Sequence, residues 1–268
     1  MESANLTFVP DAVGVTVVLD GHPQSHVCLD DPGLLAFEYV AQLALVLDTL
    51  PPGRVAVTHV GGGGLTVPRY VQHTRPGSPQ IVLEPDAALT AAVRERLPLP
   101  RGHRIRVRAT DGRTGLRALA DRSADAIVLD AYAAGRVPAD LVTVEFLADA
   151  RRVLRPGGVL AANVADEPGL RYAARVLAGF AAAGWRHRAL IATREVLKGR
   201  RFGNCVLVAG DDRFDAAPLE RACARSSLPA GIRTGAGLER LVAGARPLTD
   251  DDGEASPAPP ALDRWRIR

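Results

Sequence analysis

Short apolar runs alternate with helix-like stretches along most of this chain. The apolar runs have the length and β-branched content typical of buried strands, and they cover residues 55–60, 80–83, 105–109, 126–129, 159–163, 188–191 and 205–209. Between them, apolar residues recur at helical spacing, in the stretches 68–73, 87–96, 114–120, 141–154 and 170–183. This alternation predicts an α/β fold with a mainly parallel sheet that helices cover on both faces.

The flanking segments have different patterns. Residues 6–29 have the pattern of short strands around a turn, and residues 34–50 carry apolar positions at helical spacing. An acidic, Ser- and Pro-rich composition after residue 248 predicts disorder there. We therefore divide the chain into a β-hairpin unit at 1–30, a Rossmann-like domain at 31–210, a helical extension at 211–248 and a disordered tail at 249–268.

Composition narrows the class of protein. A chain of 268 residues with 47% hydrophobic and 24% charged residues can bury one large core. The pI of about 9.0 raises nucleic acid as a partner, but no dense basic stripe with interleaved aromatic residues is present, so we do not expect it. There is no secretory signal or long apolar run, which predicts a cytoplasmic protein without a membrane span. The spacing of Cys28, Cys205 and Cys223 predicts neither a disulfide framework nor a metal site.

The residues that follow the predicted strands carry the candidate chemistry, because ligands of such sheets bind beyond the carboxyl ends of the strands. Glycines follow the strand at 55–60, and glycine lets the backbone turn sharply and approach a ligand closely. The third small residue of a dinucleotide-binding loop would fall at Thr66, which departs from that pattern. The loop Gly61, Gly62, Gly63 therefore favours an adenosyl-sulfonium ligand over a nicotinamide dinucleotide.

Three acidic residues follow the next strands. Glu84 lies about 20 residues beyond the glycines, where an acidic side chain accepts hydrogen bonds from ribose hydroxyls. Asp111, followed by Gly112, is a candidate for the adenine amino group, although Asp-Gly is also typical of a plain turn. Asp130 with nearby Tyr132 stands where a catalytic or substrate-orienting group belongs, and a helix or loop cap is the alternative for Asp130.

The motifs form an ordered set. They are Leu19-Asp20-Gly21-His22-Pro23-Gln24, Asp30-Asp31, Glu38-Tyr39, Gly61-Gly62-Gly63, Glu84-Pro85-Asp86, Asp111-Gly112 and Asp130. In order and spacing, from about residue 18 to residue 208, the chain resembles the spermidine synthase family of polyamine aminopropyltransferases. The resemblance implies a methyltransferase-type Rossmann-like sheet and a homodimer. It also implies transfer of an aminopropyl group from decarboxylated S-adenosylmethionine to putrescine, with methylthioadenosine as the other product.

The resemblance also implies residue roles. Gln24 and the glycine backbone would lie along the nucleoside and its sulfur. Glu84 would hold the ribose, and Asp111 with Gly112 would lie at the adenine. Asp130 matches the first residue of the family's Asp-Ser-Ser-Asp stretch.

The chain departs from the family where the amine groups would bind. Gly64 replaces the aspartate of Gly-Gly-Gly-Asp-Gly-Gly, and Ala133 replaces the last aspartate of Asp-Ser-Ser-Asp, the usual catalytic carboxylate. Ala36 and Phe37 replace a tyrosine-histidine pair, and residues 198–204, with three basic side chains, replace a Tyr-Pro-Ser-Gly segment. The residues that the resemblance places at the nucleoside are retained, whereas those that it places at the diamine are replaced.

These observations leave three hypotheses. The first is a spermidine-synthase-like transferase that uses a sulfonium nucleoside as co-substrate and transfers an aminopropyl group to a small-molecule amine acceptor. The acceptor is putrescine if Asp130, Asp86 or Glu38 supplies the missing carboxylate, whereas the replaced carboxylates favour an acceptor other than a simple polyamine. The second is an S-adenosylmethionine-dependent methyltransferase, in which Arg69 is a candidate for binding the donor carboxylate. The third is a nucleoside-binding or interaction protein without catalysis, because a fold does not fix a function. No tightly bound cofactor is expected.

Overall fold

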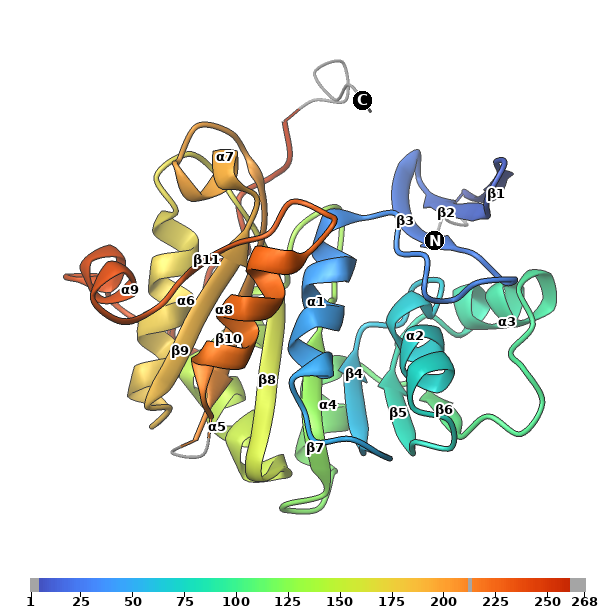
Figure 1. Cartoon of the computed structure of the whole chain (residues 1–268), viewed down its shortest axis with the longest axis horizontal. Helices are drawn as coiled ribbons and strands as arrows, with labels where there is room; N and C mark the ends of the chain where they lie inside the picture. The colour runs from blue at the N-terminus through green and yellow to red at the C-terminus, as the bar shows by residue number, and fades with distance from the viewer. Residues whose placement is uncertain (1–4, 212–213, 261–268) are drawn as a thin grey trace.

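The computed structural model describes residues 5–211 and 214–260. Its main feature is an eight-stranded sheet with the order β11-β9-β10-β8-β7-β4-β5-β6 (Figure 1). The strands are β4 Val57–Val60, β5 Gln80–Leu83, β6 Ile105–Arg108, β7 Ala124–Leu129, β8 Leu154–Asp166, β9 His187–Ala192, β10 Gly203–Gly210 and β11 Gly231–Arg233. Strands β6, β5, β4, β7 and β8 pair in parallel, while β10 and β11 run antiparallel to their neighbours. The expectation of a mainly parallel α/β sheet is confirmed.

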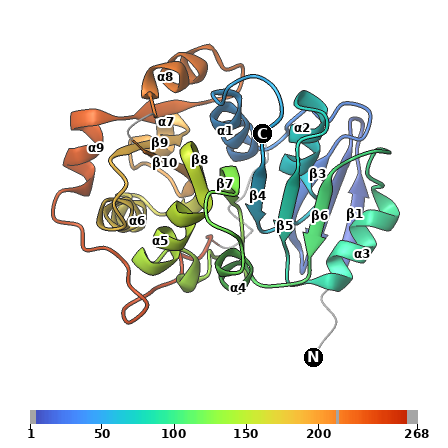
Figure 2. The same ribbon diagram turned by 90° about the horizontal axis from the view of Figure 1, so that it is seen from below.

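Helices cover both faces of this sheet (Figure 2). One face carries α1 Glu38–Asp48, α2 Thr66–Thr74 and α8 Ala216–Arg225, and the other carries α4 Gly112–Arg117, α5 Val144–Val153 and α6 Arg171–Ala182. The remaining helices are α3 Ala87–Arg96, the 3₁₀ turn η1 Ala139–Leu141, α7 Arg194–Leu197 and α9 Gly235–Val242. Because helices cover both faces, a ligand of this sheet is expected at the strand ends.

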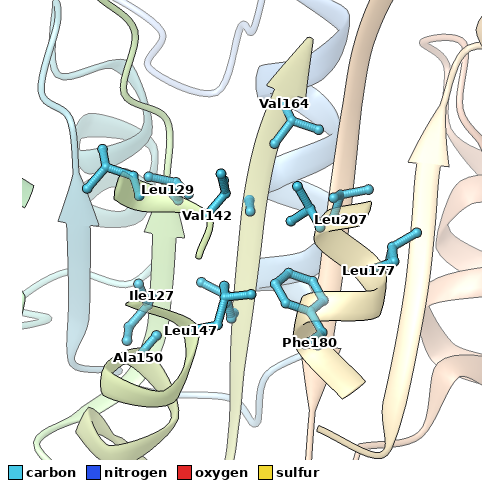
Figure 3. Packing of buried hydrophobic residues seen from close by; sticks show 14 of the residues in the cluster. Ile127, Leu129, Val142, Leu147, Ala150, Val164, Leu177, Phe180 and Leu207 are labelled. Carbon is cyan, nitrogen blue, oxygen red and sulfur yellow. The ribbon is translucent and has the colours of Figure 1, made fainter. Parts of the chain in front are cut away.

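The core is built by side chains that alternate between the two faces of the sheet, as the two-residue period of a strand requires. In β7, Ile127 and Leu129 face α5 and α6, whereas Ala126 and Val128 face α1. Figure 3 shows the α5–α6 side, where Phe180 packs near Leu207. This burial on both faces fixes the register of the strands and therefore the positions of the loops that follow them.

The N-terminal unit is a separate antiparallel sheet of three strands, rather than the two-stranded hairpin that the sequence predicts. Its strands are β1 Leu6–Pro10, β2 Val15–Leu19 and β3 His22–Val27. Val17 and Val27 pack with Leu89 and Val93 of α3, so the small sheet lies at the end of the central sheet that carries β5 and β6 (Figure 1). This packing brings β3 against the loop that follows β4.

Residues 249–260, for which the composition predicts disorder, pack on the domain without regular secondary structure. Ser256 is fully buried, and its backbone N–H donates to the carbonyl of Val137. The Val137 N–H in turn donates to Ser256 Oγ over 2.9 Å. These hydrogen bonds hold the segment in place although its composition offers few apolar side chains to bury. They connect the end of the described chain to the loop after β7. Residues 261–268 lie outside the described residues.

A second set of polar contacts fixes the start of this segment. Asp250 Oδ1 accepts a hydrogen bond from Thr143 Oγ1 over 2.7 Å, and the Asp250 carboxylate pairs with both terminal nitrogens of Arg113. Arg113 belongs to α4 and Thr143 caps α5. The segment therefore bridges the helices that flank the loop after β7.

Within residues 5–211 and 214–260, every helix is too short or too polar to cross a membrane.

Candidate functional site

The strand order changes direction at β4. The chain passes from β4 to β5 and β6 on one side, whereas β7 and β8 lie on the other side. Ligands of open α/β sheets bind at the carboxyl ends of the strands beside such a switch point. A pocket lies here, which we name the β4 pocket; residues that line it include Ser25, Tyr39, His59, Gly61, Gly62 and Asp130.

The glycine loop crosses the end of β7 at close range. Gly61 has a φ of +95°, and a Cβ at this position would overlap the carbonyl oxygen of Asp130. The Gly61 N–H donates to Leu83 O over 2.9 Å, which extends the pairing of β4 with β5. Only glycine meets both the backbone conformation and the lack of space, so the loop brings the ends of β4, β5 and β7 together.

Glu84 is held directly against the glycine loop. Its Oε2 accepts hydrogen bonds from the Gly62 N–H over 2.9 Å and from the Gly63 N–H over 3.4 Å. Its Oε1 accepts from the Asp86 N–H over 3.0 Å. The structure thus brings together the two nucleoside-binding elements that the sequence predicts, and it fixes the orientation of the carboxylate.

In β3, the side chain of Ser25, rather than that of Gln24, hydrogen-bonds to the glycine loop. Ser25 Oγ accepts a hydrogen bond from the Gly64 N–H over 2.8 Å. Gln24 falls at an irregularity in the pairing of β2 with β3, and its side chain donates to His22 O over 3.5 Å. An irregularity of this kind redirects side chains, and it gives no signal in the sequence that would have distinguished Ser25 from its neighbour.

Gly64 has no room for a side chain. A Cβ at this position would lie 2.8 Å from the Cβ of Ser25 and 3.1 Å from Cγ2 of Val27. The small sheet therefore fills the space that an aspartate would need at this place in the loop.

Asp111 caps a helix. Its Oδ1 accepts a hydrogen bond from the Thr114 N–H over 2.8 Å at the start of α4, and this bond holds the pKa of the exposed carboxyl below its usual range. Gly112 is buried beneath it, where a Cβ would overlap Cγ1 of Val60. Both residues follow β6, two strands away from β4.

Asp130 is the end of a chain of side-chain hydrogen bonds. Asn163 Nδ2 donates to Asp130 Oδ1 over 2.9 Å, and Asn204 Nδ2 donates to Asn163 Oδ1 over 3.1 Å. Burial raises the pKa of Asp130 to about 6, and the bond from Asn163 opposes part of this rise. Asp130 therefore changes its protonation state close to neutral pH, as a proton acceptor must. Asn163 and Asn204 are site residues that the sequence reasoning missed.

Two tyrosine side chains lie near the carboxyl group of Asp130. Burial and the charge of Asp130 raise the pKa of the Tyr39 and Tyr132 hydroxyls well above the usual value for tyrosine, so both remain protonated. The Tyr132 hydroxyl is buried and has no hydrogen-bond partner among the described residues. Tyr132 packs against the core on the α5–α6 side, whereas Tyr39 comes from α1 and lines the β4 pocket.

One of the three basic side chains after α7 reaches the first helix. Arg201 Nη2 lies 3.4 Å from Glu38 Oε2 at the start of α1. Lys198 and Arg200 both pair with Glu195, at 3.9 Å and 3.4 Å. The basic stretch therefore places Arg201 at the end of α1 that carries Tyr39, while the other two charges are paired within their own turn.

Arg69 does not face the pocket as a free cation. Its guanidinium donates to the carbonyl oxygens of Gly64 (3.3 Å), Pro98 (3.1 Å) and Leu97. Arg69 is 4% exposed and burial lowers its pKa to about 10. Three of the five guanidinium donors bind backbone carbonyls, and Arg69 is not among the residues that line the β4 pocket, so the structure does not support the hypothesis that Arg69 binds a donor carboxylate.

The chain is similar to known aminopropyltransferases. No protein-family model matches it. It is 31% identical over 130 residues to the polyamine aminopropyltransferase of Vibrio vulnificus (strain CMCP6), which covers 47% of this chain and 43% of that protein. The match thus spans less than half the length of this curated relative.

Solved structures extend the similarity to more than nine-tenths of the chain. A probable spermidine synthase from Corynebacterium glutamicum ATCC 13032 has a TM-score of 0.84 and 31% identity, over 93% of this chain and 94% of that chain. A spermidine synthase in complex with the transition state analogue AdoDATO has a TM-score of 0.58 and 17% identity, over 94% of this chain and 83% of that one. The second comparison shows a shared fold.

The likeness to the Corynebacterium protein covers nearly all of both chains. It agrees with the order of the glycine loop, Glu84 and Asp130 along this sequence and with their meeting at one edge of the sheet. By sequence, fold and the arrangement of this edge, the chain belongs to the spermidine synthase family.

Proposed function

We propose that this protein is a spermidine-synthase-like transferase that binds a sulfonium nucleoside and transfers its aminopropyl group to an amine acceptor. The observation that carries the proposal is the position of Asp130. Its backbone touches the glycine loop, and its carboxyl group titrates near neutral pH in the pocket beside that loop. A nucleoside cradle and a proton acceptor are therefore adjacent.

The glycine loop and Glu84 fit the nucleoside. A Cβ at Gly62 would lie 3.2 Å from Glu84 Oε2, so its absence leaves the carboxylate accessible from the loop side. Glu84 accepts three backbone N–H groups, yet a carboxylate has about four lone-pair sites that can accept further bonds. About one site is left, so a ribose hydroxyl can add to a carboxylate whose position the loop has already fixed.

The reaction needs a base and a sulfonium leaving group. The lone pair of the acceptor nitrogen attacks the aminopropyl carbon bound to sulfur, the C–N bond forms, and the C–S bond breaks. The bonding pair stays on sulfur, which becomes the neutral thioether of methylthioadenosine. The nitrogen loses one proton, and Asp130, ionised above pH 6, is placed to accept it.

In this proposal, the carboxylates that the family usually uses for catalysis are replaced by other residues. The loop residue is Gly64, where Ser25 fills the space. Ala133 is exposed in a tight turn in which its N–H donates to Arg136 O over 2.8 Å. Ammonium groups that lose their carboxylate partners bind less well, so we expect an acceptor with less positive charge than putrescine.

Calorimetric titration with methylthioadenosine, S-adenosylmethionine and its decarboxylated form tests the proposal. We expect methylthioadenosine and the decarboxylated donor to bind, and we expect turnover of that donor with an amine. Tighter binding of the carboxylated donor, with methyl transfer, would replace the proposal by a methyltransferase. Nucleoside binding without turnover across a broad amine panel would indicate a binding protein, and no binding would refute the nucleoside site.

A further inference from the structure

A buried histidine is one of the residues that line the β4 pocket. His59, on β4, is 2% exposed and lines the pocket together with Asp130 and Tyr39. In the parallel pairing of β4 with β7, His59 stands opposite Val128. Asp130 is two residues beyond Val128, so His59 and Asp130 lie on the same face of the sheet. Its position within the predicted strand 55–60 suggested no role for His59 beyond that strand.

The neighbouring Gln80 fixes which nitrogen of His59 carries the proton. Gln80 Nε2 lies 3.0 Å from Pro68 O, a carbonyl that can only accept, so the amide nitrogen must point there. Gln80 Oε1 therefore faces His59 Nε2, at 2.8 Å. A carbonyl oxygen also can only accept, so Nε2 is the protonated nitrogen and Nδ1 carries a bare lone pair.

This lone pair has no partner in the part of the chain that the structure describes. His59 Nδ1 is buried and makes no hydrogen bond there. A buried acceptor without a donor is destabilising, and native proteins rarely leave one in place without a reason. Burial lowers the pKa of His59 to about 4, so the ring does not satisfy Nδ1 by taking up a proton at neutral pH.

We propose that the β4 pocket binds a primary amino group and that His59 Nδ1 accepts one of its hydrogen bonds. The proposal rests on the proposed function, and it places the amino group of the acceptor between His59 and Asp130. Both side chains offer hydrogen-bond acceptors. An ammonium group has three N–H donors and no acceptor, so it can serve both, whereas a hydroxyl group has a single donor.

Histidine His26 provides a matched control. It is 4% exposed, its Nε2 lies 3.1 Å from Asp11 Oδ2, and its Nδ1 also lacks a partner among the described residues. His26 is not among the residues that line the β4 pocket. The two rings share burial and an Nδ1 without a partner among the described residues, but His26 contacts a carboxylate and lies outside the pocket, whereas His59 contacts an amide and lines it.

Nitrogen-15 NMR of protein with labelled histidine detects a hydrogen bond to His59 Nδ1 directly. The probe is butylamine, with butan-1-ol as its hydroxyl counterpart, at pH 8, where Asp130 is ionised. We expect butylamine to move the Nδ1 resonance of His59 in the direction of an accepted hydrogen bond and to leave that of His26 unchanged. Butan-1-ol should have a much smaller effect at equal concentration.

Variants test the energetic contribution. His59→Phe removes the acceptor and should weaken butylamine binding about 10- to 100-fold, the loss expected for a hydrogen bond to a charged group. His59→Asn places an amide oxygen near the position of Nδ1 and should restore most of the affinity. His26→Phe should bind butylamine as the wild type does. Circular dichroism of each variant establishes that it is folded before binding is compared.

The outcomes separate this inference from the proposed function. An unmoved Nδ1 resonance, or butylamine binding by His59→Phe equal to the wild type, overturns the inference even if methylthioadenosine binds. If methylthioadenosine fails to bind, the proposed function falls, while the butylamine titration of the protein alone still decides whether the pocket takes an amino group.

Discussion

Asn163 donates its side-chain amide to Asp130 Oδ1 over 2.9 Å, and no ion pair to this carboxyl group occurs within residues 5–211 and 214–260. A neutral donor compensates a buried negative charge only in part. The raised pKa of Asp130, about 6, is the result. This relationship makes the carboxyl group useful for proton transfer and costly for stability.

Asp130→Asn should therefore raise the free energy of unfolding. The folded state binds the Asp130 proton more tightly than the unfolded state does, so wild-type stability falls as pH rises from about 4 through 6. The variant has no carboxyl group at this position, so its stability does not fall for this reason as pH rises. We expect a gain of up to about 3 kcal/mol above pH 7 and no gain below pH 4. Urea denaturation across this pH range measures the difference.

Asp125→Asn is the matched control for that experiment. Asp125 pairs with Arg155 at 2.9 Å, so its charge is compensated. Loss of this partly exposed pair should lower the free energy of unfolding by no more than about 1 kcal/mol at neutral pH. A loss of stability in Asp130→Asn at pH 7 would contradict the interpretation of the buried charge.

The pH dependence of catalysis should follow the same group. If Asp130 accepts the amine proton, kcat/KM should fall about tenfold per pH unit below pH 6, where the carboxyl group becomes protonated. The Asp130→Asn variant should lose this acidic limb along with most of its activity. Steady-state rates between pH 5 and 8 give the profile, and a flat wild-type profile would assign the base to another group.

Gly61→Ala should disrupt the loop. The φ of Gly61 is +95° and a Cβ would overlap Asp130 O, so strain and overlap together should cost about 3 kcal/mol or more. Gly53→Ala separates the two effects, because Gly53 has a φ of +101° but nothing within 4 Å of its Cβ position. It should cost only about 1–2 kcal/mol in thermal unfolding. Equal costs would show that the contact with Asp130 is not tight.

If Glu84 receives a ribose hydroxyl as proposed, Glu84→Gln should weaken methylthioadenosine binding about 10- to 100-fold, because it removes the negative charge that accepts the loop N–H groups and that hydroxyl. Asp86→Ala is the control two residues away. Asp86 caps α3 through Leu89 N, so its loss should lower stability by about 1 kcal/mol and leave nucleoside affinity unchanged. Calorimetry of both variants distinguishes the ligand contact from the cap.

Deletion of residues 249–268 should free the loop after β7. Val137 N–H would lose Ser256 Oγ as its acceptor, so hydrogen exchange at this amide should accelerate by an order of magnitude or more. Deletion of residues 261–268 alone is the control and should leave the rate at Val137 unchanged. Equal rates in the two truncated proteins would mean that the bond to Ser256 does not protect the loop.

The sequence predicted the scaffold well because burial leaves a periodic record. The bounds of β5 and α3 coincide with the predicted stretches 80–83 and 87–96. The four-residue helix α7 and the three-residue strand β11 escaped prediction, because segments this short contain too few positions to show a period. Pairing with β9, rather than a pattern of its own, holds β11.

The candidate site was predictable where a glycine or an acidic residue comes directly after a predicted strand. Glu84 and the glycines were expected to meet, and they do so. Ser25 and His59 were not expected, because a residue's access to a pocket depends on distances between strands that the sequence does not record. Asp111 fitted two interpretations, and the structure places its carboxylate at the cap of α4.

The hydrogen bonds between Ser256 and Val137 imply an order in which parts of this protein fold during synthesis. A ribosome delivers the loop after β7 more than 100 residues before it delivers Ser256. The strands from β4 to β10 can pair before that point, since domains begin to fold as they emerge. We therefore expect a nascent chain to pair these strands first and to fix the segment beside Tyr132 only after Ser256 has emerged.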